Sequence, residues 1–220
     1  MHELHEFCRK EKISTVKNMI ARGANVNEKN DIGYTPLRIA CLLGNYEIAK
    51  LLISNGANVH EKNNNSDNRS NTPRYVSSPE SFLMAFRPCF YSIIDDGQTL
   101  LHDACYYKHY KIAELLISNG VNINEKNNIG HTPLSYACLY RHYEIAKLLV
   151  LHDVNLYVKD DDGMTPLMIA HKYEYHEMVN FIEKEIKKDI KKKIYILSLI
   201  INNDVIKHYI DKKIDLLFAK

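Results

Sequence analysis

Apolar side chains recur along this chain in short blocks with helical spacing rather than in strict alternation. In one representative stretch they stand at i, i+3 and i+4 in two successive blocks, Leu37, Ala40 and Cys41 and then Ile48, Leu51 and Leu52. This spacing places each block on one face of an amphipathic helix. The pair Gly44–Asn45 separates the blocks, so the pattern predicts two short helices joined by a break.

Residues at the ends of this stretch mark where the two helices begin and end. Thr35 is placed to cap the first helix, and Pro36 occupies its first turn, where a missing N–H costs nothing. Gly56 is placed to end the second helix in a left-handed conformation. An Asp-Ile-Gly turn at residues 31–33 precedes the pair and protrudes as a β-like finger. One such hairpin cannot bury its apolar faces alone, so we expect it to stack on similar neighbours.

The same unit recurs along the sequence. The motif Gly-x-Thr-Pro-Leu, once with Leu in place of Pro, occurs at residues 33–37, 97–101, 130–134 and 163–167. Its glycines are therefore 64, 33 and 33 residues apart. A fixed period of this length indicates a repeat architecture in which each unit contacts its neighbours.

This register divides the chain into units of one domain. We expect an N-terminal capping repeat (1–30), repeats at 31–63, 95–127, 128–160 and 161–188, an insertion (64–94), and a degenerate helical hairpin as C-terminal cap (189–220). The first unit is supported by the alignment of Leu4 and Cys8 with Leu37 and Cys41. Ile186 holds the place of the terminal glycine in the last repeat, so its second helix is also able to run on through the Lys-rich stretch that follows.

The insertion at 64–94 leaves the stack from the tip of a finger. Its first third is rich in Asn and Ser, and residues 78–86 have the pattern of a short helix. The interpretations that stay open at this point are a binding loop, a tolerated surface insertion of low energetic cost, and an imperfect gene model. Cys89 lies in this segment, outside any repeat, and we expect it to be exposed.

The repeated motif resembles the signature of the ankyrin repeat family, Thr-Pro-Leu-His-x-Ala at a 33-residue period. The resemblance covers residues 1–188, and His102 in Thr99-Leu-Leu-His-Asp-Ala104 is the one signature histidine that we identify. Arg38, Ser135 and Met168 stand in its place elsewhere, and we expect weaker bracing of those turns. The resemblance implies an all-α solenoid with short β-hairpin fingers that recognises a protein partner without catalysis.

Positions that differ between repeats are the candidates for partner binding. The second helices repeat almost verbatim, whereas the position after the turn glycine and the two positions before the helix break vary. The resemblance implies that ankyrin proteins bind partners with these fingers and with the adjacent surface of the first helix. The candidates are Tyr34, Leu42, Leu43, Gln98, Tyr106, Tyr107, His131, Leu139, Tyr140, Met164 and Tyr173. The alternative is that some of these side chains only cover neighbouring helices.

Charge and hydropathy restrict the kinds of partner. Lys+Arg of 29 against Asp+Glu of 27 gives a net charge of +2, which provides no global case for a polyanion partner. The apolar stretch at residues 194–201, which Ser198 interrupts, is too short for a membrane span, which needs about 20 residues. The N-terminus lacks the pattern of a secretory signal. We therefore expect an intracellular, cytoplasmic monomer with a protein partner of unknown identity.

Four cysteines share one position in successive units, Cys8, Cys41, Cys105 and Cys138. We expect them to be buried, reduced and structural, which fits a reducing compartment. Zinc ligation at Cys105/His109 or Cys138/His142 is not expected, because the helix break falls between the two members of each pair. Nucleophile, phosphate-loop and dinucleotide motifs are lacking as well. We expect no cofactor, no metal, no small-molecule substrate and no enzymatic activity.

Two alternative functions remain open from the sequence. The first is a substrate-recruiting adaptor of a ubiquitin ligase. The segment that follows Lys193 is short for this role. The second is nucleic-acid or phosphoinositide binding through Lys184–Lys193, which holds six lysines against two acidic residues. The competing interpretation of that stretch is a solvated helix face. The stretch also lacks the interleaved aromatic residues that are typical of single-strand binding grooves.

Overall fold

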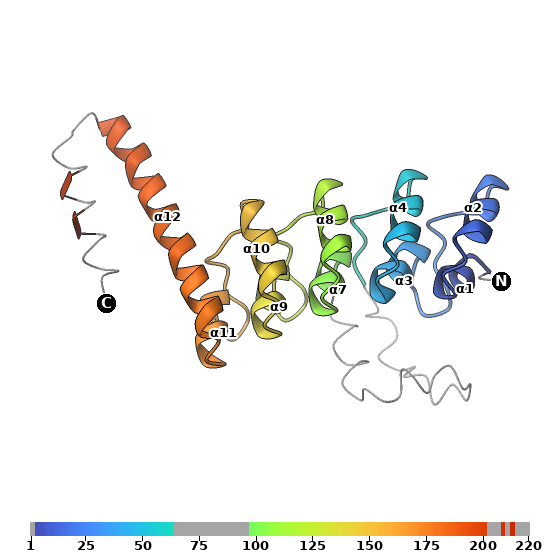
Figure 1. Ribbon diagram of the computed structural model, residues 1–220, viewed down its shortest axis with the longest axis horizontal. Helices are drawn as coiled ribbons and strands as arrows, with labels where there is room; N and C mark the ends of the chain where they lie inside the picture. The colour runs from blue at the N-terminus through green and yellow to red at the C-terminus, as the bar shows by residue number, and fades with distance from the viewer. Residues whose placement is uncertain (1–2, 64–96, 202–207, 210–211, 214–220) are drawn as a thin grey trace.

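The computed structural model describes residues 3–63, 97–201, 208–209 and 212–213, and every named element in them is a helix. The helices are α1 (Glu3–Arg9), α2 (Ile13–Ala21), α3 (Pro36–Leu43), α4 (Tyr46–Ser54), α7 (Leu100–Tyr106), α8 (Tyr110–Ser118), α9 (Pro133–Leu139), α10 (Tyr143–Leu151), α11 (Pro166–Lys172) and α12 (His176–Ile201). They form five antiparallel pairs that stand side by side in one row (Figure 1). The first helices contact one another in the order α1, α3, α7, α9 and α11. The predicted all-α repeat solenoid is confirmed.

The first helices begin at capping threonines, as the sequence predicts. In each of four units the threonine hydroxyl accepts a hydrogen bond from the backbone N–H three residues on, at Thr35, Thr99, Thr132 and Thr165. Proline follows three of these caps, where no N–H is needed. Each such cap is worth about 1 kcal/mol.

The core runs through all units as one continuous cluster. The second helices of the three central units bury the same three positions, namely Ile48, Ala49 and Leu52, Ile112, Ala113 and Leu116, and Ile145, Ala146 and Leu149. On the first helices, the four repeated cysteines are fully buried, which agrees with their expected structural role. Burying one such aliphatic side chain stabilises the fold by about 1.5–3 kcal/mol.

The break between the two helices of each unit requires one residue in the left-handed conformation. Gly44 has a φ of 79° at this position. The equivalent positions of the other units hold long charged residues with φ between 55° and 61°, namely Glu11, Lys108, Arg141 and Glu174. This conformation is disfavoured by roughly 1–2 kcal/mol for a residue that has a Cβ. Only one of the five units therefore makes its turn without strain.

The fingers are turns rather than strand-paired hairpins, which differs from the expectation of short β-hairpins. Each is closed by one side chain: Asn30 Oδ1 accepts from the N–H groups of Ile32 and Tyr34, and Asn127 Oδ1 accepts from those of Ile129 and His131. Because the side-chain amide satisfies these donors within the turn, no ladder is needed. Among the described residues, the one β-bridge joins Lys62 and Thr99.

The last helix continues past the end of its unit. α12 runs without interruption from His176 to Ile201 and passes through residues 188 and 189, where we expected one unit to end and a separate hairpin cap to begin. Half-buried Ile186 in place of a glycine permits this continuation. The insertion at 64–94, with Cys89, and most of residues 202–220 lie outside the described residues.

Candidate partner-binding surface

The candidate residues differ in how much of their side chains reaches the surface. Leu43 and Tyr173 are the most exposed, with 42% and 43% of their surface accessible. The half-buried candidates are Tyr34, Leu42, Tyr106, Tyr107, His131, Leu139, Tyr140 and Met164. They come from the fingers and from the ends of the first helices, so the repeats carry them in register along one side of the stack. These residues could both support the fold and contact a partner.

Gln98 departs from this expectation because its side chain is buried, with 1% accessible surface. Its Nε2 donates to the hydroxyl of Tyr136 at 2.8 Å. Its backbone carbonyl accepts from both terminal nitrogens of Arg38 at 3.3 Å. Gln98 therefore links its own unit to the units on both sides, and we remove it from the candidate contact residues.

Tyrosines from α7 and α9 meet in one cluster. The ring of Tyr106 stands edge-on to Tyr107 and to Tyr140, with centroid distances of 4.7 Å and 4.6 Å. Tyr140 stacks on Tyr136 at 5.9 Å. Such aromatic pairs stabilise by about 0.5–1.5 kcal/mol each beyond their buried area. The half-buried rings Tyr106, Tyr107 and Tyr140, which we call the tyrosine surface, are thus held in fixed positions.

Tyr136 organises this cluster, and the sequence analysis missed it. It is buried, with its hydroxyl bonded by Gln98 and by Asn127 Nδ2 at 3.2 Å. His131 also packs edge-on against its ring at 5.5 Å. The available signal was the presence of Tyr at a position that holds Ile39 and Ile169 in other units.

Histidines at the helix breaks tie each unit to the one before it. His109 donates from Nε2 to the carbonyl of Leu42 at 3.2 Å, and His142 donates from Nδ1 to the carbonyl of Cys105 at 2.7 Å. Burial lowers the pKa of both imidazoles below the usual value, so they are neutral at pH 7. Both histidines therefore act as braces of the breaks.

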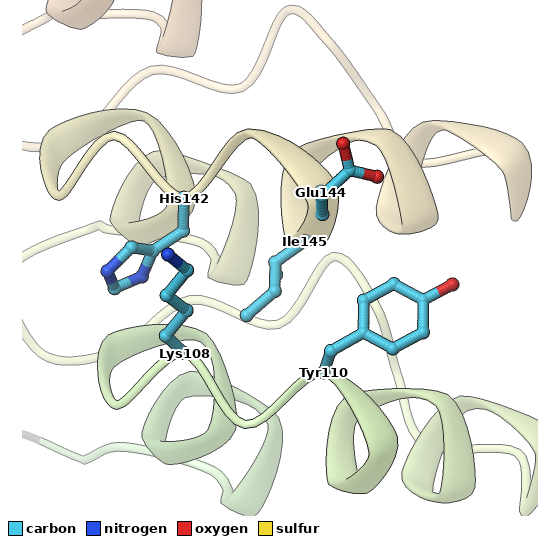
Figure 2. A pocket seen from close by; sticks show the side chains of 5 residues that line it. All are labelled: Lys108, Tyr110, His142, Glu144 and Ile145. Carbon is cyan, nitrogen blue, oxygen red and sulfur yellow. The ribbon is translucent and has the colours of Figure 1, made fainter.

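A cavity of about 390 Å³ opens beside one of these breaks, between the starts of α8 and α10 (Figure 2). Its lining residues are Lys108, Tyr110, His142, Glu144 and Ile145. Ile145 is buried, whereas Tyr110 and the two charged side chains reach the surface. The site combines an apolar floor with charges of both signs at its rim.

Cations accompany the tyrosines at the helix breaks. Lys108, Arg141 and Lys172 are exposed, and none of them forms an ion pair with a residue in the described ranges. The Arg141 guanidinium lies over the ring of Tyr175 at 5.5 Å, and the Lys172 ammonium lies over that of Tyr173 at 5.9 Å. This side of the stack therefore offers aromatic rings and positive charge together.

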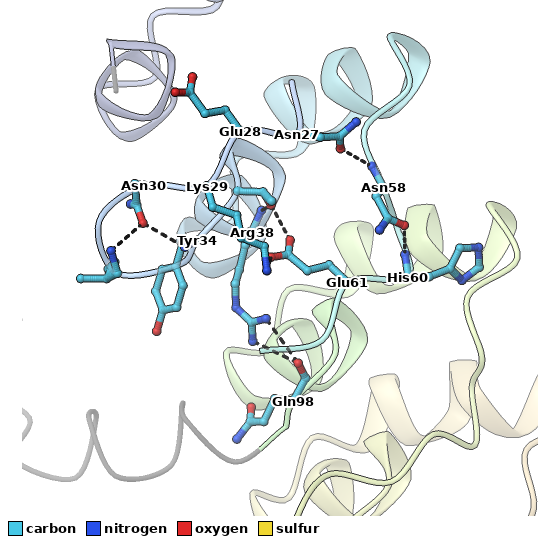
Figure 3. A network of polar contacts seen from close by, with 12 residues as sticks. Asn27, Glu28, Lys29, Asn30, Tyr34, Arg38, Asn58, His60, Glu61 and Gln98 are labelled. Atoms are coloured by element: carbon cyan, nitrogen blue, oxygen red, sulfur yellow. Dashed lines mark hydrogen bonds and ion pairs between the residues drawn. The ribbon is translucent and has the colours of Figure 1, made fainter. Parts of the chain in front are cut away.

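The junction between α3 and α7 is held by a buried ion pair (Figure 3 shows its Arg38 side). Arg38 Nη2 lies 2.9 Å from Asp103 Oδ2, and both side chains are buried. Beside it, the hydroxyl of Thr35 donates to the carboxylate of Glu61 at 2.5 Å. The expectation of weaker bracing is wrong for Arg38, because its guanidinium reaches the next unit and bonds the Gln98 carbonyl as well.

The junction between α7 and α9 is held by a neutral histidine. Backbone N–H of Thr99 donates to His102 Nδ1 at 3.2 Å, and His102 Nε2 donates to the carbonyl of His131 at 3.0 Å. Burial lowers the pKa of His102 to about 4. His5 holds the same position in the first unit and bonds the carbonyl of Tyr34 at 3.0 Å, so His102 is not the one signature histidine of this chain.

Metal and membrane sites receive no support from the described ranges. No group of three or more His, Cys, Asp or Glu side chains within them is arranged to hold a metal ion. None of the helices in the described part combines the length and apolar character that crossing a bilayer requires.

The chain is similar to a known protein family. The family model described as ankyrin repeats (3 copies) matches residues 3–76 and 101–193. A search of curated proteins found no match.

Proposed function

The chain belongs to the ankyrin repeat family, and on that premise we propose that it binds a protein partner through its fingers and the ends of its first helices. Ankyrin repeats are generally protein–protein interaction modules, and the family is generally non-catalytic. The proposed contact residues are Tyr34, Leu42, Leu43, Tyr106, Tyr107, His131, Leu139, Tyr140, Met164 and Tyr173.

The tyrosine surface is the observation that carries this proposal. Tyr106, Tyr107 and Tyr140 fix one another by ring contacts at 4.6–4.7 Å while each keeps part of its surface accessible. A ring that is already immobile loses little conformational entropy on binding, and tyrosine supplies a large contact area. Half-buried aromatic residues supported by their neighbours are typical of binding hot spots.

The two alternative functions have less support. In the Lys-rich stretch of α12, Lys188 pairs with Glu185 at 2.6 Å and Lys193 pairs with Asp189 at 2.7 Å. These pairs reduce the positive charge that a phosphate group could use. The adaptor role depends on residues after α12, most of which lie outside the described residues.

Paired substitution of the tyrosine surface tests the proposal. A partner is captured by affinity purification, identified by mass spectrometry and titrated against the purified chain. The variant Tyr107→Ala/Tyr140→Ala should weaken binding by at least ~2 kcal/mol, the threshold for a hot spot. It also loses ring contacts with Tyr106, so circular dichroism is used to choose a temperature at which it remains folded.

Two further variants serve as comparisons. Tyr173→Ala removes an exposed ring of the same surface at little cost in stability and should weaken binding to a smaller degree. Tyr195→Ala/Tyr209→Ala removes two exposed rings, with 49% and 63% accessible surface, from outside the proposed surface and should leave binding unchanged. Unchanged affinity in the Tyr107→Ala/Tyr140→Ala variant, together with a large fall in melting temperature, would show that these rings serve packing alone.

A further inference from the structure

Strained backbone at the helix breaks marks positions where side-chain identity matters. Gly44 shows the unstrained solution, yet Lys108 and Arg141 adopt φ of 61° and 57° at the equivalent positions. A residue held in a disfavoured conformation on the surface, where a glycine would serve the fold better, suggests a function for its side chain. Here the side chains are long cations directly after the rings of Tyr107 and Tyr140.

The positive charges of Lys108 and Arg141 are not neutralised by ion pairs within the described residues. Neither Lys108 nor Arg141 has an ion-pair partner among the residues that the structure describes. Glu144 lies at the rim of the cavity that Lys108 also lines, and Glu174 holds the equivalent position of the next unit. At this position two consecutive units therefore carry a cation, whereas the following unit carries an acid.

The spacing of the units suggests the shape of the partner. Packed neighbouring helices lie roughly 8–10 Å apart, so equivalent side chains of the α7 and α9 units repeat at about this distance. A polyproline II segment advances about 9 Å every three residues and presents one face with that period. Aromatic-lined surfaces are a recurrent means of recognising such segments.

We propose that the helix-break edge, defined as Tyr107, Lys108, Tyr140 and Arg141, binds an extended acidic segment of the protein partner whose carboxylates stand three residues apart. One carboxylate faces Lys108 and the next faces Arg141, while the intervening residues lie on the two rings. This inference rests on the proposed protein-binding function and adds the chemistry of the partner to it. A nucleic acid is disfavoured because a chain with a phosphate at every nucleotide would also meet Glu144 and Glu174.

Synthetic peptides test the periodicity. Fluorescence anisotropy is measured with the full chain and labelled acetyl-(Pro-Pro-Glu)₅-amide, with (Pro-Pro-Gln)₅ and a peptide of the same composition with its five Glu residues clustered as controls, and with an oligothymidylate. The periodic acidic peptide should bind best, and its affinity should fall as salt rises. Equal binding of the clustered peptide, or equal or tighter binding of the oligothymidylate, would overturn the proposal.

A glycine exchange tests the cations without damaging the fold. Lys108→Gly/Arg141→Gly removes both charges and relieves the backbone at both positions, so its melting temperature should be unchanged or higher. Binding of the periodic acidic peptide should weaken about tenfold, as expected for two solvent-exposed ion pairs. Glu174→Gly is the matched control, since it makes the same backbone change but removes a negative charge, and it should bind as tightly as the unmodified chain or more tightly.

The captured partner separates this inference from the function on which it rests. If Tyr107→Ala/Tyr140→Ala weakens partner binding while Lys108→Gly/Arg141→Gly leaves it unchanged, the acidic segment is wrong and the protein-binding function stands. If neither pair of substitutions changes partner binding, both proposals fail.

Discussion

Two neighbouring junctions of the same stack hold their units together by opposite means. Between α3 and α7, Arg38 and Asp103 bury a full ion pair at 2.9 Å. Between α7 and α9, the equivalent of Arg38 is His102, which stays neutral and bonds the His131 carbonyl. Both side chains reach into the next unit, where Arg38 meets a carboxylate and a backbone carbonyl and His102 meets a backbone carbonyl alone. The comparison teaches that one position of a repeat can change its chemistry if the facing unit changes with it.

The two junctions should also respond oppositely to acid. Burial lowers the pKa of His102 to about 4, so folding opposes its protonation, and its contribution to stability is lost as pH falls from about 6.5 towards 4. Burial raises the pKa of Asp103 to about 6, although Arg38 acts in the other direction. Folding then favours the protonated carboxyl, so the contribution of Asp103 to the stability of the fold decreases as pH rises from about 4 to 6.

The largest expected effect comes from breaking the ion pair. Arg38→Leu leaves Asp103 buried without its cation and should lower the free energy of unfolding by about 3–5 kcal/mol in chemical denaturation. The double variant Arg38→Leu/Asp103→Ile should recover most of this loss, since apolar replacement of a whole buried pair is often neutral. Isoleucine is the residue at the position of Asp103 in two other units, Ile39 and Ile169. A double variant as unstable as the single one would contradict the assignment of the junction to this pair.

Acid titration of two conservative variants sharpens the contrast. His102→Gln should cost about 1–3 kcal/mol at pH 7, the range for impairing one buried hydrogen bond, and its deficit relative to the unmodified chain should shrink towards pH 4. Asp103→Asn should change in the opposite sense, with its stability relative to the unmodified chain increasing as pH rises from about 4 to 6. Denaturation midpoints across this range provide the measurement. Parallel profiles for the two variants would remove the proposed difference between the junctions.

The smallest effects concern the backbone beside each junction. A Cβ on Gly44 would lie 2.7 Å from the ring of His109, and its φ is 79°, so Gly44→Ala should destabilise by about 1–3 kcal/mol. Lys108 occupies the same position at the next break with φ of 61°, so Lys108→Gly should stabilise by up to ~1 kcal/mol. Thermal melts of both variants test this prediction. If both melting temperatures shift in the same direction, the two positions do not share a requirement for the left-handed conformation.

Local patterns in the sequence predict most of the fold. The capping threonine, the helical spacing of Leu, Ala and Cys, and the period of 33 residues act within one unit or between adjacent ones, so they can be read without coordinates. Ile186 in place of a glycine likewise indicates that the last helix can continue. These features depend on propensity and burial, which are properties of short segments.

Contacts between units were harder to predict. Arg38 and Asp103 are 65 positions apart, and the sequence analysis noted Arg38 as a departure from the repeat without identifying Asp103 as its partner. Gln98 occupies a position that varies between units, as a contact residue should, yet it is turned inward by Arg38 and Tyr136. Sequence variation between units therefore identified positions that the repeat does not constrain. It did not show which of these positions contact a partner and which contact a neighbouring unit. The remaining surface candidates stay predictions until a partner is titrated.

The four repeated cysteines can report how readily each of the first four units unfolds locally. Burial raises the pKa of Cys8 to about 12 and raises the pKa of Cys41, Cys105 and Cys138 further, so each thiol reacts with a labelling reagent only when its unit unfolds locally. In a linear array, stability depends on nearest neighbours, and terminal units open most easily. Four labelling rates, one for each of the first four units, would therefore chart the free energy of opening from Cys8 at the end of the stack to Cys105 and Cys138 in its interior, without any engineered probe.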